Sequence, residues 1–464
     1  METKTASVKN DVSLEEAPVI EDEKTDTLDR KVSGTIVSST VNMVNTILGT
    51  GILSMPYTFA SLGIAQGFFF LSFSCILGIF GLSLLTLAAQ AVGGRNISFN
   101  SLSKATFPAA AVIMDVAVAI TVFGAAISYL IVAGSLLADI TGVLSQKWWV
   151  TISVLVVFPL GFLRRLDSLK YTSILALLAI AYLVGIVVFY ALLWPPGMPK
   201  DHISLDQVVW WKDDVATLGR VSPIFVFAFT CHTNLFSIHN ELVSNTNRRM
   251  HTVIFTTSFV TYALYLLVAV VGYLSFFASQ NWSDNIITMY PRGPVTLVAE
   301  VHPCRASLEK IIDTITGKPS VGITSTGKHV AMTTFMIAAS WGVAFSVKDL
   351  STVLGFVGAT GSTIICYMLP GILYYKVGKN QVFRYLGLAM AVFGMLAGLA
   401  FRGQVTTPFQ ALSFLYVRGS SVGMHPVTDA KTSADPKIID EALDTNERSP
   451  TGTLLRCEQQ SRHA

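Results

Sequence analysis

Long apolar runs separated by short polar segments make up most of the chain. Ten such runs fall near residues 35–58, 63–91, 109–140, 148–163, 171–194, 218–240, 252–278, 329–347, 352–375 and 383–401. A helix needs about 20 apolar residues to cross the hydrocarbon layer of a membrane. A strand exposed to lipid would leave backbone polar groups unpaired, and no alternation of period two indicates a barrel. The pattern therefore predicts an all-α membrane protein.

Basic residues in the connecting loops predict the orientation of the chain. They follow the second, fourth and sixth runs and precede the last one: Arg95 and Lys104; Arg164, Arg165 and Lys170; Arg248 and Arg249; Lys376, Lys379 and Arg384. The positive-inside rule assigns these loops and the N-terminus to the cytosol. The loop before the last run can lie in the cytosol with the others only if the chain crosses the membrane once more between residues 291 and 313. Within that stretch only residues 295–299 are apolar. We therefore expect about 11 transmembrane helices, with helix 8 degenerate.

Polar tails flank the apolar region and set the predicted domain boundaries. Residues 1–33 are acidic and lack the features of a signal peptide, so we expect a disordered cytosolic tail before a transmembrane domain at 34–401. Residues 402–464 are predicted to be a polar, disordered tail, apart from an apolar patch at 409–417. Asn281 begins an Asn-Trp-Ser sequon on the non-cytosolic side and is a candidate for glycosylation.

The composition agrees with a chain that is largely dissolved in lipid. Hydrophobic residues make up 52% and charged residues 13% of the 464 residues, against about a quarter charged in soluble domains, and the mean hydropathy is +0.57. The net charge of +3, without a basic block, argues against nucleic-acid binding. The five cysteines include no CxxC pair, so neither a metal site nor a disulfide framework is supported. Without a nucleophile–base pair or a phosphate loop, the sequence predicts neither an enzyme nor a cofactor.

The first run contains a candidate break. It reads VNMVNTILGTGILSMPY and places Gly49-Thr50-Gly51 in mid-membrane, although glycine costs about 1 kcal/mol relative to alanine inside a helix. An unwound segment would free backbone N–H groups for an anionic substrate group. Close packing through small residues explains the same motif and is favoured by the motif alone. Asn42 and Asn45 beside Thr46 shift the balance towards a site, because amides in a bilayer need partners inside the protein or a bound ion.

The sixth run contains a second candidate break. It reads SPIFVFAFTCHTNLFSIHNEL, and the polar residues Thr230–Asn234 interrupt an aromatic-rich helix. Because a histidine side chain can titrate near neutral pH, His232 is a candidate for proton coupling; the alternative is a structural hydrogen bond. Glu241, at the cytosolic end, is better explained as a solvated carboxylate or as a partner of Arg248 or Arg249.

The positions of the two breaks predict a transport fold. Folds built from two inverted five-helix repeats break their helices at corresponding positions, and the substrate binds between the breaks. The first and the sixth runs have this relationship, so the pair indicates a secondary transporter. Weaker candidates lie in the third run: Asp115 and Asp139 near its ends, and Tyr129 in its middle, which faces either the core or the site.

Four motifs together resemble the amino acid/auxin permease family. They are the first run and the sixth run quoted above, then HPCRASL, and then VLGFVGATGSTIICYMLPGILYYK. The resemblance covers residues 33–401, and its nearest members are fungal vacuolar amino acid transporters and animal sodium-coupled neutral amino acid transporters. It implies 11 helices in a LeuT-like inverted five-helix repeat (the APC superfamily) and ion-coupled amino acid transport.

The resemblance also implies site residues. The broken first and sixth helices of the family hold the α-carboxylate and the amino group of the substrate. On this chain the substrate-binding residues would be Thr46, Gly49, Thr50, Gly51, Phe227, Cys231 and Thr233. Asn45 matches an asparagine that serves the cation in sodium-coupled relatives, and no other metal ligand is assigned. Asn42, Asn45 and His232 are therefore the candidates for ion or proton coupling.

One departure from the family leaves the coupling ion open. TMYPRGPVTLVAE runs almost directly into HPCRASL, so the middle of helix 8 is missing, and this helix supplies a hydroxyl ligand in sodium-coupled relatives. The leading hypothesis is a proton-coupled symporter of amino acids in the vacuolar or lysosomal membrane. The alternatives are sodium-coupled neutral amino acid uptake at the plasma membrane, and a non-transporting amino acid sensor or inactive homologue. The amino acid, the direction of transport and the oligomeric state stay open.

Overall fold

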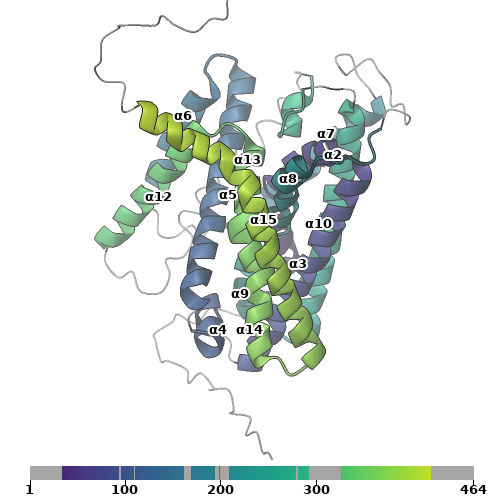
Figure 1. The fold of residues 1–464 in the computed structure, drawn as a ribbon, viewed down its shortest axis with the longest axis vertical. Helices are drawn as coiled ribbons and strands as arrows, with labels where there is room; N and C mark the ends of the chain where they lie inside the picture. Colours follow the sequence, from purple (N-terminus) through teal and green to yellow (C-terminus); the bar gives the residue numbers. More distant parts are fainter. Residues whose placement is uncertain are drawn as a thin grey trace, which may run out of the picture. The chain divides into compact units, whose positions relative to one another are not determined.

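The described part of the chain is helical. The computed structural model describes residues 34–93, 96–108, 110–160, 169–193, 198, 208–277, 279, 281–291 and 326–419. The chain divides into two compact units, residues 1–409 and 410–464. The elements are α1 Ile36–Ile47, α2 Gly51–Leu62, α3 Ile64–Val92, α4 Phe99–Thr106, α5 Ala110–Thr141, α6 Gln146–Leu160, α7 Leu169–Leu193, α8 Val215–Ala228, α9 His232–Glu241, α10 Asn247–Phe276, the 3₁₀ helix η2 Ile286–Met289, α12 Thr326–Ser346, α13 Leu350–Val357, the π-helical segments η3 Gly358–Ser362 and η4 Ile364–Met368, α14 Leu369–Val377 and α15 Gln381–Gly419 (Figure 1).

The helices confirm the predicted class of all-α membrane protein. Among the described residues, seven segments are long and apolar enough to cross a membrane, and the pair α1–α2 forms an eighth span that is bent by 54°. Each of the ten predicted apolar runs coincides with one helix or with one interrupted series of helices. The count of 11 crossings and the degenerate helix 8 remain predictions, because residues 292–325 lie outside the described part.

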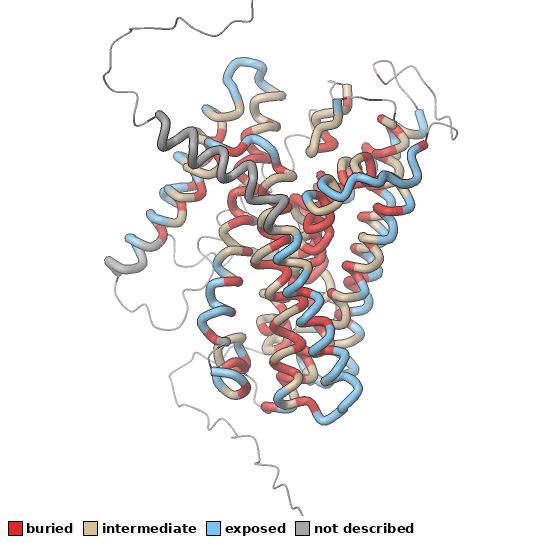
Figure 2. Tube along the Cα trace, viewed as in Figure 1, coloured by how far each residue is buried: buried red, intermediate tan, exposed pale blue. Residues whose placement is uncertain are grey.

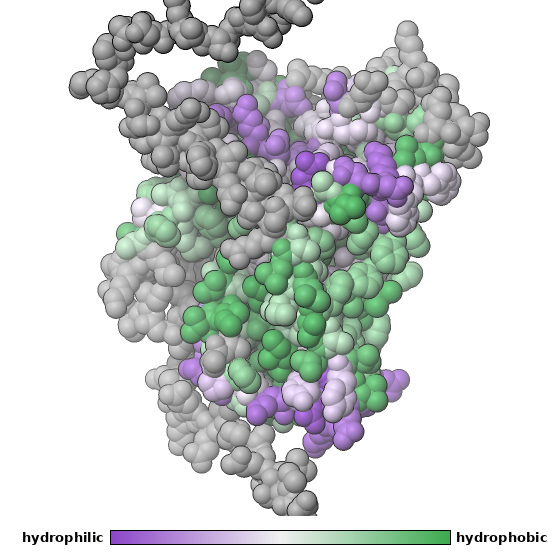
Figure 3. All heavy atoms as spheres, in the orientation of Figure 1, coloured by the Kyte–Doolittle hydropathy of each residue, from purple (hydrophilic) through white to green (hydrophobic). Residues whose placement is uncertain are grey.

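The exposed surface of the helices is apolar, as lipid contact requires. Phe259 in α10 is 74% exposed and Leu399 in α15 is 61% exposed, although a soluble protein would bury such side chains. In the space-filling view the apolar residues form a central band between polar residues at the two ends (Figure 3). Buried residues concentrate on the inner helices, whereas much of α15 is exposed (Figure 2).

The last helix is longer than the sequence predicted. The predicted disordered tail begins at residue 402, but α15 continues to Gly419, so residues 402–419 are helical. The apolar patch at 409–417 contains neither glycine nor proline, so the helix can continue through it. The predicted tail at 1–33 and the rest of the C-terminal tail at 420–464 lie outside the described residues, as do Arg95, Arg164 and Arg165.

Polar caps begin three of the helices. Thr35 and Ser98 form capping boxes at α1 and α4, and the Asp214 carboxylate accepts hydrogen bonds from the Ala216 and Thr217 amides at the start of α8. The Thr217 hydroxyl also donates to Asp214 at 2.6 Å and is the main reason that the pKa of this carboxyl is lowered. Such caps satisfy the free N–H groups of a first helical turn where the chain enters the membrane.

Candidate functional site

The first span is broken where the sequence predicted. The Leu48 amide donates to the Val44 carbonyl and closes α1, and the chain then turns before α2 begins at Gly51. Within the described part of the chain, the amides of Thr50, Gly51 and Ile52 form no backbone hydrogen bond. Free N–H groups at a helix N-terminus, together with the helix dipole, form a site for an anion.

The sixth span is broken at the corresponding place. Helix α8 ends at Ala228, and α9 begins at His232. In the turn between them, the Thr230 amide donates to the Phe227 carbonyl and the Cys231 amide to the Phe229 carbonyl. Helices α2 and α8 pack against each other (Figure 1), which brings the start of one half-helix beside the end of another.

Tyr265 in α10 joins the two breaks. Its hydroxyl lies 2.6 Å from the Ile47 carbonyl oxygen at the end of α1 and 3.0 Å from the Ala228 carbonyl oxygen at the end of α8. The side chain is fully buried. The single hydroxyl proton is therefore shared between the last turns of both half-helices, and it holds them in a defined relative position. Nothing in the sequence alone distinguishes Tyr265 from other tyrosines in apolar helices.

Both glycines of the first break lie where an added side chain would meet close neighbours. A methyl group added at Gly51 would lie 3.3 Å from the Cβ of Ala228. At Gly49 it would contact the hydroxyl of Tyr129, so α5 brings Tyr129 to the break. Gly51 therefore lies both at a break in the span and in close packing with α8, and its role in substrate binding remains a prediction. Of the two alternatives for Tyr129, the structure supports the one that faces the break.

The polar residues of the two broken spans meet at Thr46. Its hydroxyl donates to the Asn42 carbonyl and accepts a hydrogen bond from the Asn234 side-chain amide, each at 2.9 Å. Asn234 links α9 to α1, and the sequence analysis did not place it among the site residues, although it ends the polar block of the sixth run. Asn45 lies one residue away and is half-buried.

This link predicts a measurable coupling between Thr46 and Asn234. In a double-mutant cycle of Thr46→Val and Asn234→Ala, we expect a coupling of about 0.6–1 kcal/mol in the free energy of unfolding, as is typical of hydrogen bonds between membrane helices. The measurement is the thermal or denaturant unfolding of the purified protein. Thr252 is a matched control, because its hydroxyl also donates to a carbonyl in its own helix, that of Arg248. The cycle of Thr252→Val with Asn234→Ala should be additive, and additivity in both cycles would contradict the link.

The remaining predicted substrate residues surround the breaks. Thr50 and Cys231 are buried, whereas Phe227 and Thr233 are half-buried. The Thr50 hydroxyl is buried without a hydrogen-bond partner within the described part of the chain. The roles of these residues in binding remain predictions.

His232 lies against η4 and α3 and not against the first break. Its Nδ1 lies 3.2 Å from the Cys366 sulfur in η4, and that sulfur lies 3.4 Å from the Thr230 hydroxyl. A methyl group added at Gly81 in α3 would lie 3.0 Å from its Nε2. The imidazole therefore links the sixth span to η4 and α3. Its role in proton coupling remains a prediction.

The described residues contain no group of three or more His, Cys, Asp or Glu side chains that could hold a metal ion. A sodium site at Asn45 needs the predicted eighth helix, which lies outside the described part. Asn281, the candidate for glycosylation, is exposed at the end of the molecule opposite the basic loops.

A bundle with two broken spans, whose free helix ends meet inside the membrane, is the architecture of a secondary transporter. The sequence model described as "Transmembrane amino acid transporter protein" matches residues 33–403. The chain therefore belongs to this family, which is not enzymatic, and the predicted resemblance is confirmed.

Relatives with known names agree with this family. The chain is 34% identical to Vacuolar amino acid transporter 5 of Schizosaccharomyces pombe, with 73% of this chain and 83% of the relative covered. It is 28% identical to Vacuolar amino acid transporter 5 of Saccharomyces cerevisiae, with 78% and 96% covered. Among solved structures, a manganese transporter of Eremococcus coleocola aligns with a TM-score of 0.47 and 12% identity, over 84% of this chain and 91% of that one.

Proposed function

We propose that the chain is a proton-coupled symporter that carries amino acids across the vacuolar membrane by alternating access. The observation that carries this proposal is the pair of broken spans, held together by Tyr265. The family and the names of the vacuolar relatives support the substrate class and the membrane.

The helix ends at the two breaks complement an amino acid zwitterion. The free amides of Thr50, Gly51 and Ile52 at the start of α2 attract the α-carboxylate. The carbonyl ends of α1 and α8 carry the negative end of each helix dipole and attract the ammonium group. Thr46, Gly49, Phe227, Cys231 and Thr233 would line the same space. Because the groups that bind the two charges belong to the backbone, they recognise what all amino acids share.

Protons are the proposed coupling ion. Asn42, Asn45 and His232 are the residues proposed to serve the ion. A sodium site would need further oxygen ligands, and those expected from helix 8 are missing from the sequence. Sodium-coupled uptake at the plasma membrane remains the second candidate, because Asn45 matches the cation-site asparagine of sodium-coupled relatives.

Flux measurements on the reconstituted protein test the proposal. We expect uptake of labelled amino acids into proteoliposomes to rise when a pH gradient is imposed, and to persist when choline replaces sodium. Empty liposomes are the control. Absence of flux for every amino acid would contradict the proposal, and substrate-induced thermal stabilisation without flux would identify a sensor instead. Flux that disappears in choline would favour sodium coupling.

A further inference from the structure

A short segment after α10 closes one end of the helical bundle. Residues 281–291 include η2, which packs against α2, and Ile286, Ile287 and Tyr290 are buried. The Tyr290 ring lies 4.9 Å from that of Tyr190 in α7 and 5.1 Å from that of Phe276 in α10. The segment lies at the end opposite the basic loops, which the positive-inside rule assigns to the lumen of the vacuole.

Asp284 attaches this segment to two spans. Its carboxylate accepts a hydrogen bond from the Ser351 amide in the first turn of α13 at 2.7 Å. Its backbone carbonyl accepts a hydrogen bond from the Ser54 hydroxyl in α2 at 2.8 Å. Ser54 is fully buried and lies one turn after Gly51. One residue therefore connects the broken first span to the start of the span formed by α13 to α14.

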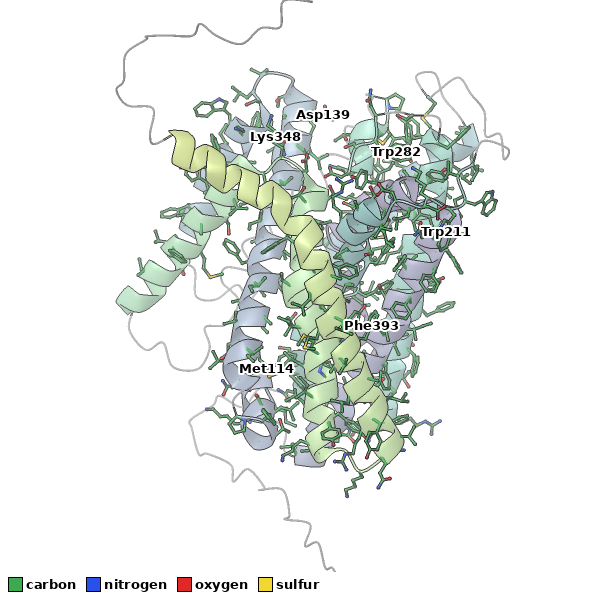
Figure 4. All side chains as sticks on the ribbon, in the orientation of Figure 1. Met114, Asp139, Trp211, Trp282, Lys348 and Phe393 are labelled. Atoms are coloured by element: carbon green, nitrogen blue, oxygen red, sulfur yellow. The ribbon has the colours of Figure 1, made fainter. Side chains whose placement is uncertain are left out.

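No cation neutralises the Asp284 carboxylate within the described part of the chain. The charged residues at this end of the packed elements are the exposed Lys348 and Asp349 before α13 and the half-buried Asp139 at the end of α5; α2 contributes none. Figure 4 shows Lys348 and Asp139 at the same end of the molecule as Trp282. The nearby charge that acts on Asp284 is the like charge of Asp349. Removal from water raises the pKa of the Asp284 carboxyl above its ordinary value, and the Ser351 amide opposes this only in part.

We propose that Asp284 binds a proton during the transport cycle, and that proton binding from the lumen favours the arrangement in which residues 281–291 are closed against α2 and α13. This inference rests on the proposed function and deepens its coupling step. In the closed arrangement Asp284 is half-buried and its carboxylate accepts the Ser351 amide hydrogen bond, whereas separation of the segment from α2 and α13 would hydrate it fully.

The thermodynamic linkage between proton binding and closure determines which state the proton favours. In the closed state the carboxyl has a raised pKa and binds its proton more tightly than in a hydrated, open state. Binding of the proton must therefore stabilise the closed state by the same free energy. The stabilisation is present at acidic lumenal pH and is lost as the pH rises through the closed-state pKa. An acidic lumen would thus promote closure on the lumenal side, which is the step that precedes opening to the cytosol.

Asp284→Asn is the decisive variant, because asparagine still accepts a hydrogen bond from the Ser351 amide but cannot titrate. The measurement is the initial rate of amino acid transport in proteoliposomes as a function of the pH on the lumenal face. We expect the rate of the unmodified protein to rise on acidification and that of Asp284→Asn to show a smaller pH response, because His232 is still present in this variant. Asp349→Asn is the matched control: it removes a neighbouring but exposed carboxylate and should keep the pH response, with the midpoint moved to lower pH because the like charge that raises the pKa of Asp284 is gone.

Two further measurements separate this inference from the proposed function. If the unmodified protein exchanges no amino acid at symmetric pH, the proposed function fails. If it does exchange amino acids, a pH response that Asp284→Asn retains in full would overturn only the role of Asp284, whereas an absent pH response in the unmodified protein would contradict proton coupling as well. Should Asp284→Asn not fold, Asp284→Glu takes its place. This variant should transport with a shifted pH midpoint, and an unchanged midpoint would contradict the inference.

Discussion

Replacement of Gly51 by valine is expected to abolish amino acid transport while the protein still folds. A methyl group at this position already lies 3.3 Å from the Ala228 Cβ, so the larger valine forces α2 away from α8. The amides at the start of α2 then no longer lie opposite the end of α8. Because a displacement of about 1 Å can cost on the order of 100-fold in a positioned site, we expect at least about that loss in transport rate. The measurement is uptake of labelled amino acids by the reconstituted variant.

Gly185 offers a matched control for this experiment. It is an exposed glycine in α7, and a methyl group added there would meet no atom within 4 Å. Gly185→Val therefore introduces the same side chain into a membrane helix without a collision and should transport normally. Size-exclusion profiles of both variants in detergent report whether they fold. Wild-type kinetics in Gly51→Val would contradict a substrate site at the broken first span.

Replacement of Tyr265 by phenylalanine is expected to weaken substrate binding and transport strongly. The change removes the hydroxyl that bridges the Ile47 and Ala228 carbonyls and leaves both buried carbonyls without this donor. A lost buried hydrogen bond costs about 1–3 kcal/mol, and each 1.4 kcal/mol corresponds to about a tenfold change in affinity. We therefore expect a loss of about tenfold or more in apparent substrate affinity, measured by the concentration dependence of uptake.

Tyr262→Phe is the control in the same helix. The Tyr262 hydroxyl also forms one hydrogen bond, at 2.8 Å to the hydroxyl of Ser72 in α3, but it has no part in the breaks. Its removal should lower stability without a comparable loss of affinity. Equal effects of the two variants on affinity would show that Tyr265 has only a general packing role.

The spans and their two interruptions were predictable because their signals are local. About 20 consecutive apolar residues specify a membrane helix in any context. The first break is marked by Gly49 and Gly51, because glycine destabilises the interior of a helix. The second is marked by the polar block at Thr230–Asn234, because polar side chains in a membrane need partners inside the protein. The end of α15 was placed too early, because a polar composition outweighed a short apolar patch in that prediction.

The connections between these elements were not predictable, because each depends on partners far apart in the sequence. Tyr265 has the appearance of any tyrosine in an apolar helix, and its hydroxyl reaches carbonyls 218 and 37 positions away. Asn234 acquires its role from Thr46, and Asp284 acquires its role from Ser54 and Ser351. The polar interruptions likewise did not indicate that His232 contacts Cys366.

By itself, the sequence determined that this protein crosses a membrane many times, that its first and sixth spans are broken, and that it resembles amino acid transporters. These properties follow from hydrophobic periodicity and backbone chemistry, which each residue carries wherever it lies. Only the tertiary structure decided that Tyr265 joins the breaks, that Tyr129 faces Gly49, and that Asp284 connects α2 to α13. Hydrogen bonds and desolvation depend on which atoms are brought together, and that arrangement exists only once the helices have packed.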